Sequence, residues 1–323
     1  MKWDADKFNV GLATLQENLS KIQQNISDAR EILASQFYDL ANLMLSVVRD
    51  DVFQGALLRD AVVSRFLEVT SVSDEKNERA ISQNSGFVAL GVESDAERGF
   101  IKLCETMLDL SPKYFERRFS TSDFIETDSE ELPDYALGLV SYFKNIYADM
   151  AYESFSKYVN SPRASYQNDF SSVCEFVYNG ECEYGILPFE NSSDGLLTSF
   201  YSLITRYELK IVRQCSILQA DGQSETKFVL LKKKLDFDDI TDEGKCAEIV
   251  FSPDGDNGIS GVLSAIECIG CEIIRVNAVR RIYDGNYNYG VAFICKEDQL
   301  DLLMLYLSVR NAQYNLLGFY SYS

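Results

Sequence analysis

The chain of 323 residues contains no histidine, and this absence excludes several kinds of active site. A Ser-His-Asp or Cys-His nucleophile, a zinc site of the His-Glu-x-x-His type and a histidine acid–base catalyst all require an imidazole. Basic residues are also few, with 30 Lys and Arg against 50 Asp and Glu and a formal net charge of −20. Nucleic acids and anionic membranes bind clustered Lys and Arg, so we expect neither as a partner.

Long apolar runs are absent as well. The first ten residues contain no apolar core of the kind found in a signal peptide, and stretches such as Leu302–Val309 are too short to span a bilayer. Eight cysteines are scattered from Cys104 to Cys295, which indicates buried thiols rather than disulfides. The close pair Cys268 and Cys271 lacks the second pair that a metal site requires. We therefore expect no metal and a cytoplasmic location.

Proline is absent from the first 111 residues and glycine from residues 12–54, so nothing there interrupts a helix. Apolar residues in this region recur at alternating steps of three and four, at Leu12, Leu15, Leu19, Ile22, Ile26, Ala29 and Leu33. This spacing predicts an amphipathic helix or a short coiled coil. The pattern resumes from Phe37 to Val48, and we expect a helical domain over residues 1–119. That domain serves oligomerisation or partner binding, or it is a self-contained bundle.

A run of acidic residues without Lys or Arg follows, at Asp123, Glu126, Asp128, Glu130, Glu131 and Asp134. Like charges repel, so this stretch is interpreted as a solvated linker over residues 120–140. Beyond the linker, predicted strands alternate with predicted helices, which is typical of an α/β or α+β arrangement.

The most informative segment runs from Glu183 to Gly195 and reads EYGILPFENSSDG. Residues 184–187 form an apolar run typical of a buried strand, and Pro188 is expected to end it. The polar residues 190–193 then fall at the carboxyl end of the strand, where α/β proteins usually bind ligands. Residues 196–207 are predicted to form the next helix, capped by Asp194 or a serine. This arrangement is either a carboxylate site or an ordinary capped turn.

The same string resembles the P-x-E-N-S-x-x-G motif of the prephenate dehydratase family, whose members convert prephenate to phenylpyruvate. Residues 170–184 resemble the family's helix and turn before this strand, residues 207–212 its following strand, and residues 225–231 its Thr-Arg-Phe strand. The resemblance implies catalysis without a cofactor. It also implies a set of site residues, with Thr226, Glu190, Asn191 and Ser192 as catalytic groups and Lys227, Phe228 and Ser193 in contact with the substrate.

The C-terminal part is predicted to follow the order β-α-β-β-α-β, with strands at 247–251, 272–279 and 289–295 and helices at 261–269 and 300–309. This order and the ending at residues 316–320 are similar to the ACT regulatory domain that ends such dehydratases. The resemblance implies a regulatory ligand site for phenylalanine at Gly261, Val262, Leu263 and Asn277. The family's glutamate that faces the ammonium group of the ligand is missing here.

Three features depart from the family. The stretch 147–154, where the family has a glycine-rich strand and turn, contains no glycine. Lys227 replaces the arginine of the family and lacks its planar fork for a carboxylate. Only 35 positions separate Asn191 from Thr226, which leaves no room for the second catalytic lobe of the family.

The sequence therefore predicts a multidomain α+β protein. We expect a helical domain at 1–119, an acidic linker at 120–140, a reduced α/β dehydratase-like lobe at 141–235 and a βαββαβ ACT-like domain at 240–323. The expected function is that of a degenerate prephenate dehydratase, a homo-oligomer that senses an amino acid. Two alternatives stay open. One is an active carbon–oxygen lyase that releases water and CO₂ from prephenate, and the other is an oligomeric scaffold.

Overall fold

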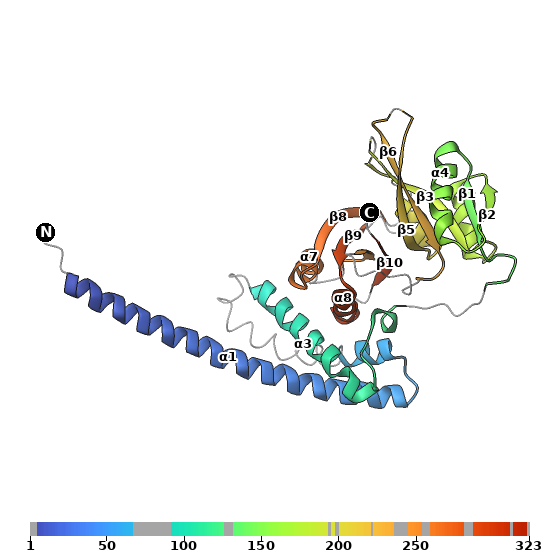
Figure 1. Cartoon of the computed structure of the whole chain (residues 1–323). Helices are drawn as coiled ribbons and strands as arrows, with labels where there is room; N and C mark the ends of the chain where they lie inside the picture. The colour runs from blue at the N-terminus through green and yellow to red at the C-terminus, as the bar shows by residue number, and fades with distance from the viewer. Residues whose placement is uncertain are drawn as a thin grey trace.

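The computed structural model describes residues 5–66, 92–125, 132–192, 195–197, 200–220, 222–235, 245–253, 259–280, 287–310 and 313–321. This part of the chain combines an N-terminal helical region with one large mixed sheet (Figure 1). The helical region consists of α1 (Ala5–Phe53), a helical segment at residues 58–66 and α3 (Val92–Phe115). None of the helices in these ranges is long and apolar enough to cross a membrane.

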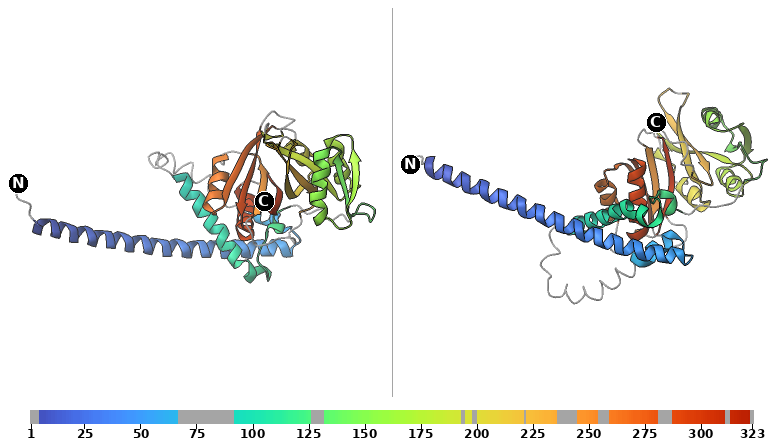
Figure 2. Two further views of the ribbon diagram at one scale, coloured as in Figure 1. Left: turned by 45° about the horizontal axis from the view of Figure 1, so that its top comes forward. Right: turned by 60° about the horizontal axis from the view of Figure 1, so that its bottom comes forward.

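The predicted N-terminal helix is confirmed as α1, which has 49 residues. Its second half is packed, because Ala41, Leu45 and Val48 are fully buried and α3 lies against it. Its first half extends away from the rest of the described chain in every view (Figures 1 and 2). A helix this long with one end unsupported needs another source of stability, since isolated helices are marginal in water.

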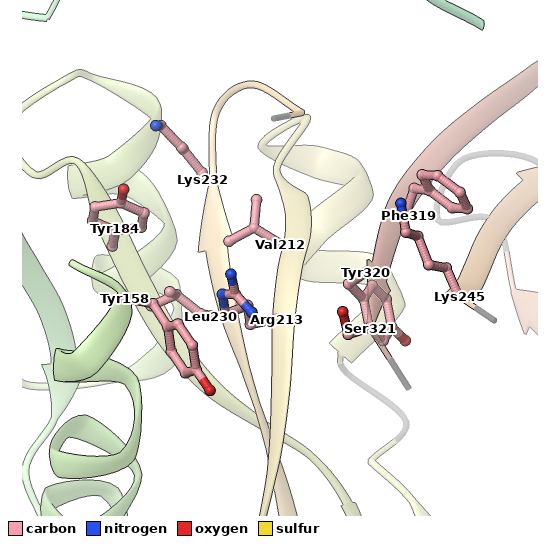
Figure 3. Close-up of a pocket in the computed structure, with 10 residues that line it drawn as sticks. All are labelled: Tyr158, Tyr184, Val212, Arg213, Leu230, Lys232, Lys245, Phe319, Tyr320 and Ser321. Atoms are coloured by element: carbon pink, nitrogen blue, oxygen red, sulfur yellow. The ribbon is translucent and has the colours of Figure 1, made fainter. Parts of the chain in front are cut away.

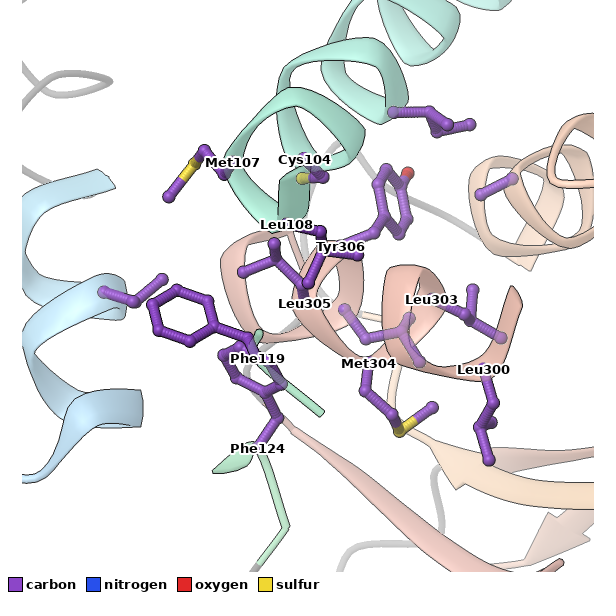
Figure 4. Packing of buried hydrophobic residues seen from close by; sticks show 14 of the residues in the cluster. Cys104, Met107, Leu108, Phe119, Phe124, Leu300, Leu303, Met304, Leu305 and Tyr306 are labelled. Atoms are coloured by element: carbon purple, nitrogen blue, oxygen red, sulfur yellow. The ribbon is translucent and has the colours of Figure 1, made fainter. Parts of the chain in front are cut away.

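The N-terminal helices do not form a core of their own. Helix α3 packs on α7 (Ile259–Cys268) and α8 (Glu297–Arg310). These three helices, the second half of α1 and the segment 58–66 share one hydrophobic cluster, part of which Figure 4 shows. Buried side chains occupy successive positions 303–307 of α8, as expected for a helix enclosed between a sheet and other helices. The self-contained bundle considered for residues 1–119 is therefore not observed.

The interpretation of residues 120–140 as a solvated linker was wrong at both ends, because Ala136 is fully buried and Leu139 begins a strand at one end, and the other end is packed as well. Thr121–Asp123 form a short 3₁₀ helix, and the neighbouring Phe119 and Phe124 are fully buried against α8 (Figure 4). The amide and hydroxyl of Thr121 both donate to Oδ1 of Asp301, at 2.6 and 2.8 Å. The acidic composition of the segment suggested that it is solvated, but the rings of Phe119 and Phe124 provide enough apolar surface to pack it against α8. The acidic residues at 126–131 lie outside the described residues.

The first half of the sheet carries the segment that contains the predicted motif. Its strands lie in the order β2-β1-β3-β6-β5, where β1 is Leu139–Phe143, β2 Arg163–Gln167, β3 Tyr184–Asn191, β5 Lys210–Leu218 and β6 Glu225–Lys232. The short β4 (Gly195–Leu196) pairs with β3. Strands β1, β2 and β3 are parallel, and β6 is antiparallel to β3 and β5. Helices cover both faces, namely α4 (Ile146–Phe155), α5 (Phe170–Tyr178) and α6 (Phe200–Arg206), with a 3₁₀ turn at Ser156–Tyr158.

Two local predictions in this half need correction, and the stretch compared with the family's glycine-rich strand and turn has another structure. The stretch 147–154 is helical, because the side chain of Asn145 accepts from the amides of Tyr147 and Ala148 and starts α4. Pro188 does not end its strand, since β3 continues past it to Asn191. The helix predicted at 196–207 begins at Phe200, after the residues of β4. The proposed caps at residues 193 and 194 lie outside the described residues.

The second half of the sheet has the predicted β-α-β-β-α-β order. Its elements are β7 (Lys245–Phe251), α7, β8 (Glu272–Arg280), β9 (Tyr287–Cys295), α8 and β10 (Tyr314–Ser321). The strands are antiparallel in the order β8-β9-β7-β10. Helices α7 and α8 cover one face, and α6 from the first half contacts the other face at β8.

The two halves form one continuous sheet because β10 pairs with β5 in parallel, in register at Gly318 and Ile211. A Cβ atom on Gly318 would lie 2.7 Å from the carbonyl oxygen of Ile211. The strands approach this closely because residue 318 has no side chain.

Candidate functional site

A β-bulge in β3 orients the predicted motif. Pro188 is in register with Phe228 and Glu190 with Lys227, so one residue is inserted between them at Phe189. Phe228 packs with the hydrophobic cluster under α4, whereas Phe189 packs against Phe200 of α6 at a ring distance of 5.5 Å. The inserted residue places Phe189 and Glu190 together on the α6 face of the sheet. Glu190 therefore lies within a strand and not in a turn before a helix.

The carboxylate of Glu190 contacts two cations from different halves of the sheet. Its Oε2 lies 3.2 Å from Nζ of Lys227, the cross-strand neighbour on β6, and 3.3 Å from a guanidinium nitrogen of Arg275 on β8. Arg275 also contacts Oε1 of Glu248 on β7 at 3.0 Å. The guanidinium carbon of Arg275 lies 5.0 Å from the centre of the Phe189 ring. This planar cation connects the two carboxylates across the junction, as its fork geometry favours.

Glu248 is the most deeply buried charged group of this network, with no exposed surface. The hydroxyl of Tyr320 donates to its Oε2 at 3.1 Å, and the hydroxyl of Tyr201 on α6 donates to its Oε1. Gly290 on β9 makes room for Tyr201, since a Cβ atom there would lie 3.2 Å from the tyrosine ring. A buried carboxylate is tolerated when it is both ion-paired and hydrogen-bonded, and Glu248 is both.

The ionisation of the network follows from its burial. Burial, and then the neighbouring charge of Glu248, raises the pKa of Tyr201 and of Tyr320 well above the ordinary value. Burial alone lowers the pKa of Arg275, but Glu248 and the two tyrosines outweigh it and raise that pKa overall. Near neutral pH the tyrosines are therefore hydrogen-bond donors and the guanidinium is charged.

A cavity of about 140 Å³ lies beside this network. The residues around it are Glu190, Gln214, Lys227, Cys246, Ile274, Arg275, Ala292 and Tyr320. Two cations and one carboxylate of the lining thus meet next to apolar side chains, and Glu248 contributes a second negative charge behind Arg275. The four charges balance. The arrangement suits a ligand that has both an anionic and a cationic group, because each would find an opposite charge.

The structure separates the residues predicted to be catalytic. Lys227 faces α6 together with Glu190, whereas Thr226 lies on the opposite face because successive side chains of a strand alternate. Thr226 is in register with Asn191 and accepts a hydrogen bond of 2.8 Å from Gln219.

Two further predicted residues, the catalytic Ser192 and the substrate residue Phe228, are not among the residues around the cavity. Ser192 is exposed, and its hydroxyl accepts from the amide of Glu225 at 2.9 Å. Phe228 is buried beneath α4. Ser193 lies outside the described residues. Of the predicted catalytic and substrate residues, Glu190 and Lys227 are the pair that the structure brings to the cavity.

The residues predicted to bind a regulatory ligand do not meet within one chain. Gly261, Val262 and Leu263 lie in α7, where Val262 is buried and Leu263 packs on the helical cluster. Asn277 lies on β8, on the strand face of Arg275 rather than the face of α7, and its amide nitrogen is buried without a hydrogen bond in the described structure. Burial of Val262 in the core leaves it no surface for a ligand.

Sequence reasoning missed four residues of the network, namely Arg275, Glu248, Tyr201 and Tyr320. Glu248 had a recognisable signal, since an acidic residue within an otherwise apolar strand is unusual. Tyr320 belonged to the ending that was compared with ACT domains, but nothing in the sequence indicated a polar partner. Arg275 is 85 residues from Glu190, and only the fold brings them together.

Comparison with known proteins supports the resemblance over part of the chain. The model of the prephenate dehydratase family matches residues 145–219. The match includes Glu190, Asn191 and Ser192, whereas Thr226 and Lys227 lie beyond it. The resemblance to this family is thereby confirmed for the segment that carries the motif. No curated protein matches the chain significantly.

Several solved structures are similar to the chain at low identity. Prephenate dehydratase from Streptococcus mutans is 16% identical, with 56% of this chain and 97% of that chain covered and a TM-score of 0.47. Prephenate dehydratase from Arthrobacter aurescens, in complex with L-Phe, is 13% identical, with 57% and 90% covered and a TM-score of 0.46. A protein described as a novel type of quorum quenching acylase is 16% identical, with 57% and 95% covered and a TM-score of 0.46.

Proposed function

We propose that this chain is a degenerate relative of prephenate dehydratase that senses an amino acid instead of catalysing the dehydratase reaction. The observation that carries the proposal is the position of Glu190. Its carboxylate is held by Lys227 and Arg275 at 3.2 and 3.3 Å, whereas Thr226 lies on the other face of the sheet. A carboxyl and a hydroxyl group on opposite faces do not act on one substrate, since catalysis requires both at the reacting atoms.

The connection between β5 and β6 supports the same proposal. Strand β5 ends at Leu218 and β6 begins at Glu225, and the two form an antiparallel hairpin over their whole length. The family places its second catalytic lobe between its Glu-Asn-Ser region and its Thr-Arg-Phe strand, an interval that includes this connection. The reaction of a prephenate dianion benefits from a site that excludes water on all sides, and a hairpin of this length supplies no second wall.

The charges of the cavity indicate the ligand class. An α-amino acid carries one ammonium and one carboxylate group, which match Glu190 on one side and Lys227 with Arg275 on the other. A cavity of about 140 Å³ is close in size to one that holds a benzene molecule, so it can enclose a group of the size of the phenylalanine ring. The family resemblance makes L-phenylalanine the first ligand to test.

Calorimetric titration with L-phenylalanine tests the proposal. We expect saturable binding that Glu190→Gln and Arg275→Gln each weaken tenfold or more, because each removes one charge-assisted contact. Glu175→Gln, a change on α5 away from the cavity, is the matched control and should leave binding unchanged. Absence of binding at millimolar phenylalanine, or equal binding by all variants, would contradict a sensing role for this cavity.

Dehydratase activity is the alternative, and it is tested separately. Purified protein is mixed with prephenate, and the formation of phenylpyruvate is followed. We expect the uncatalysed rate. Turnover that disappears in Thr226→Val would overturn the degenerate assignment and would show that the two faces of the sheet cooperate in the reaction.

Oligomerisation through α1 is a second proposed property. The first half of α1 extends from the molecule (Figure 2), and its sequence contains the apolar stripe from Leu12 to Leu33. The side chains of Ile32 and Leu33 are 60% and 50% exposed. The heptad spacing matches a coiled coil, so we propose a second copy of α1 as the partner. Light scattering that shows a monomer at all concentrations would contradict this proposal.

A further inference from the structure

The fold separates the two cysteines that lie close together in the sequence. Cys268 is exposed at the end of α7, whereas Cys271 is 6% exposed and belongs to the hydrophobic cluster of α7 and α8. Between them, Gly270 has a φ of +88° and the amide of Cys271 donates to the carbonyl of Ile266 at 3.1 Å. This helix C-cap directs the chain from the helix surface into the core. The Cys-x-x-Cys string therefore brings one thiol to the surface and the other into the core.

Cys271 instead lies opposite Cys295 of β9. Glu272 is in register with Ile294, so Cys271 and Cys295 are the next opposed pair at the end of these antiparallel strands. Opposed residues on antiparallel strands have Cα atoms about 4.5–5.5 Å apart, and disulfides join Cα atoms about 4.4–6.8 Å apart. Both side chains pack in the same cluster, and both thiols are free. The backbone thus holds two thiols at the separation of a cross-strand disulfide.

The two thiols interact with each other and differ in acidity. A hydrogen bond from the thiol of Cys295 lowers the pKa of Cys271, although burial and the charge of Asp298 oppose this shift. The same hydrogen bond, and then burial, raises the pKa of Cys295. The thiolate is the form of cysteine that attacks a disulfide. Cys271 is therefore the attacking thiol of the pair, and Cys295 is the one that reacts second.

A cation lies near the second thiol. Strand β7 pairs with β9 on the side away from β8, and Lys245 of β7 is in register with Cys295. Lys245 is 5% exposed, and its Nζ lies 4.8 Å from the centre of the Phe319 ring (Figure 3). Its positive charge acts to lower the pKa of Cys295, against the larger effects of the hydrogen bond and of burial. Lys245 thus favours the Cys295 thiolate, which the second step of an exchange requires.

The thiol pair lies close to the surface of the protein. Glu272 and Lys296, the sequence neighbours of the two cysteines, are exposed. The turn that precedes β8 is held by Gln299 in the first turn of α8, whose amide nitrogen donates to the carbonyls of Ile269 and Gly270 at 3.1 Å each. Release of these two hydrogen bonds allows the turn to open locally, which requires less free energy than unfolding. A small reagent can reach the thiols through such an opening.

We propose that Cys271 and Cys295 form a reversible intrachain disulfide by exchange with a small disulfide of the glutathione class. In the first step the Cys271 thiolate attacks one sulfur of the small disulfide and breaks its S–S bond. A mixed disulfide forms, and the first small thiolate leaves and takes the proton that Cys271 gave up. In the second step Cys295 attacks Sγ of Cys271, and its proton passes to the second small thiolate. Two protein thiols are oxidised, and one small disulfide is reduced to two thiols.

The disulfide would fix one end of a strand at the edge of the sheet. Among the described strands, β8 pairs with β9 alone. It also carries Arg275, which contacts Glu190 and Glu248 on the other face. The proposal does not depend on amino-acid sensing, because it concerns two thiols on the α7 and α8 face of the sheet. Disulfides of this kind in reducing compartments are usually transient and respond to the redox state.

The test is incubation of the full chain with mixtures of oxidised and reduced glutathione. Remaining thiols are alkylated, and the chain is digested without reductant and analysed by mass spectrometry. We expect linked peptides that contain Cys271 and Cys295, in a fraction that rises with oxidised glutathione and falls again with dithiothreitol. Cys271→Ser and Cys295→Ser should each abolish the link. Cys268→Ser is the matched control, since it removes the exposed cysteine of the same string, and it should leave the link unchanged.

The stability of the oxidised chain provides a second readout. Oxidation should raise the urea midpoint by about 1 M or more, because a link between residues 271 and 295 restricts the unfolded chain. Cys268→Ser should show the same increase. Cys271→Ser and Cys295→Ser should show none.

Three outcomes would overturn the proposal. The first is the absence of a link between Cys271 and Cys295 at millimolar oxidised glutathione. The second is a link between Cys268 and Cys271 in its place. The third is a link that forms only in urea, because it would then belong to the unfolded chain. Circular dichroism establishes that each serine variant is folded, and if one is not, the linked peptides of the original chain decide.

Discussion

Gly318 is the residue at which β10 meets β5, and replacing it by alanine should loosen the contact between the two halves of the sheet. The added Cβ atom would lie 2.7 Å from the carbonyl oxygen of Ile211 and 2.8 Å from its Cβ atom. Ordinary contact begins near 3.4 Å, so the strands must separate by about 0.7 Å (3.4 − 2.7) at this position. The obstacle is backbone, which does not rotate away as the end of a side chain does.

The expected cost follows from overpacking. Extra methyl groups in a well-packed interior destabilise proteins by about 1–3 kcal/mol. Since the urea dependence of unfolding is about 1–3 kcal/mol per molar, a loss of about 2 kcal/mol lowers the urea midpoint by roughly 1 M. Gly318→Ala should also weaken binding at the Glu190 cavity, because Tyr320 lines it.

Gly99→Ala is the matched control, and its effect should have the opposite sign. Gly99 lies inside α3, and an added Cβ atom would be 3.7 Å from the Phe37 ring, which is an ordinary contact. Alanine should stabilise the helix by about 0.5–1 kcal/mol. Urea unfolding followed by circular dichroism measures both variants. An unchanged or higher urea midpoint for Gly318→Ala would refute the close approach of the strands. A lower midpoint for both variants would show that an added methyl group destabilises this protein at either position, and the result for Gly318→Ala would then not support the close approach.

Three further predictions concern the buried charges and the long helix. Arg275→Met should lower the free energy of unfolding by about 3–5 kcal/mol, because Glu248 would remain buried without its cation; an unchanged urea midpoint would contradict the ion pair. Burial raises the pKa of Asp301, although the hydrogen bonds from Thr121 oppose this shift. The protonated carboxyl group therefore contributes fully to folding stability below about pH 3.8, and that contribution is lost as the pH rises through the pKa of the folded state. Asp301→Asn keeps an oxygen acceptor for Thr121, so its stability relative to the original chain should increase from pH 4 to pH 7 in thermal melts, and a decrease would exclude the linkage. Ile26→Asp should turn a coiled-coil oligomer into a monomer in light scattering, whereas Asn25→Asp on the same helix turn should not, and equal behaviour of the two would rule out the predicted stripe.

Much of the secondary structure was predictable because it depends on neighbours close in sequence. The stripe from Leu12 to Leu33 and the absence of proline and glycine were enough to predict α1. The strands and helices from residue 245 onward followed from short apolar runs separated by polar turns. Periodicity and helix-breaking residues act within a few positions, so one sequence contains that information.

The functional site was predictable only in part. Glu190 and Lys227 were identified because they lie in or beside a motif that resembles a known family. Arg275 and Glu248 were not, because they lie on two other strands and carry no local signal of their interaction. The network forms only because the fold brings β7 and β8 close to β3. The relative position of strands that are distant in sequence depends on packing over the whole sheet.

The sequence was enough to locate the motif, to exclude histidine chemistry and to predict the order of the C-terminal strands and helices. Which motif residues share a face depends on how the strands pair. One inserted residue at Phe189 places Glu190 beside Lys227, while Thr226 faces the other side. A bulge of a single residue exchanges the faces of every later side chain on a strand. Its position is set by the pairing of two strands and not by the residues of either one.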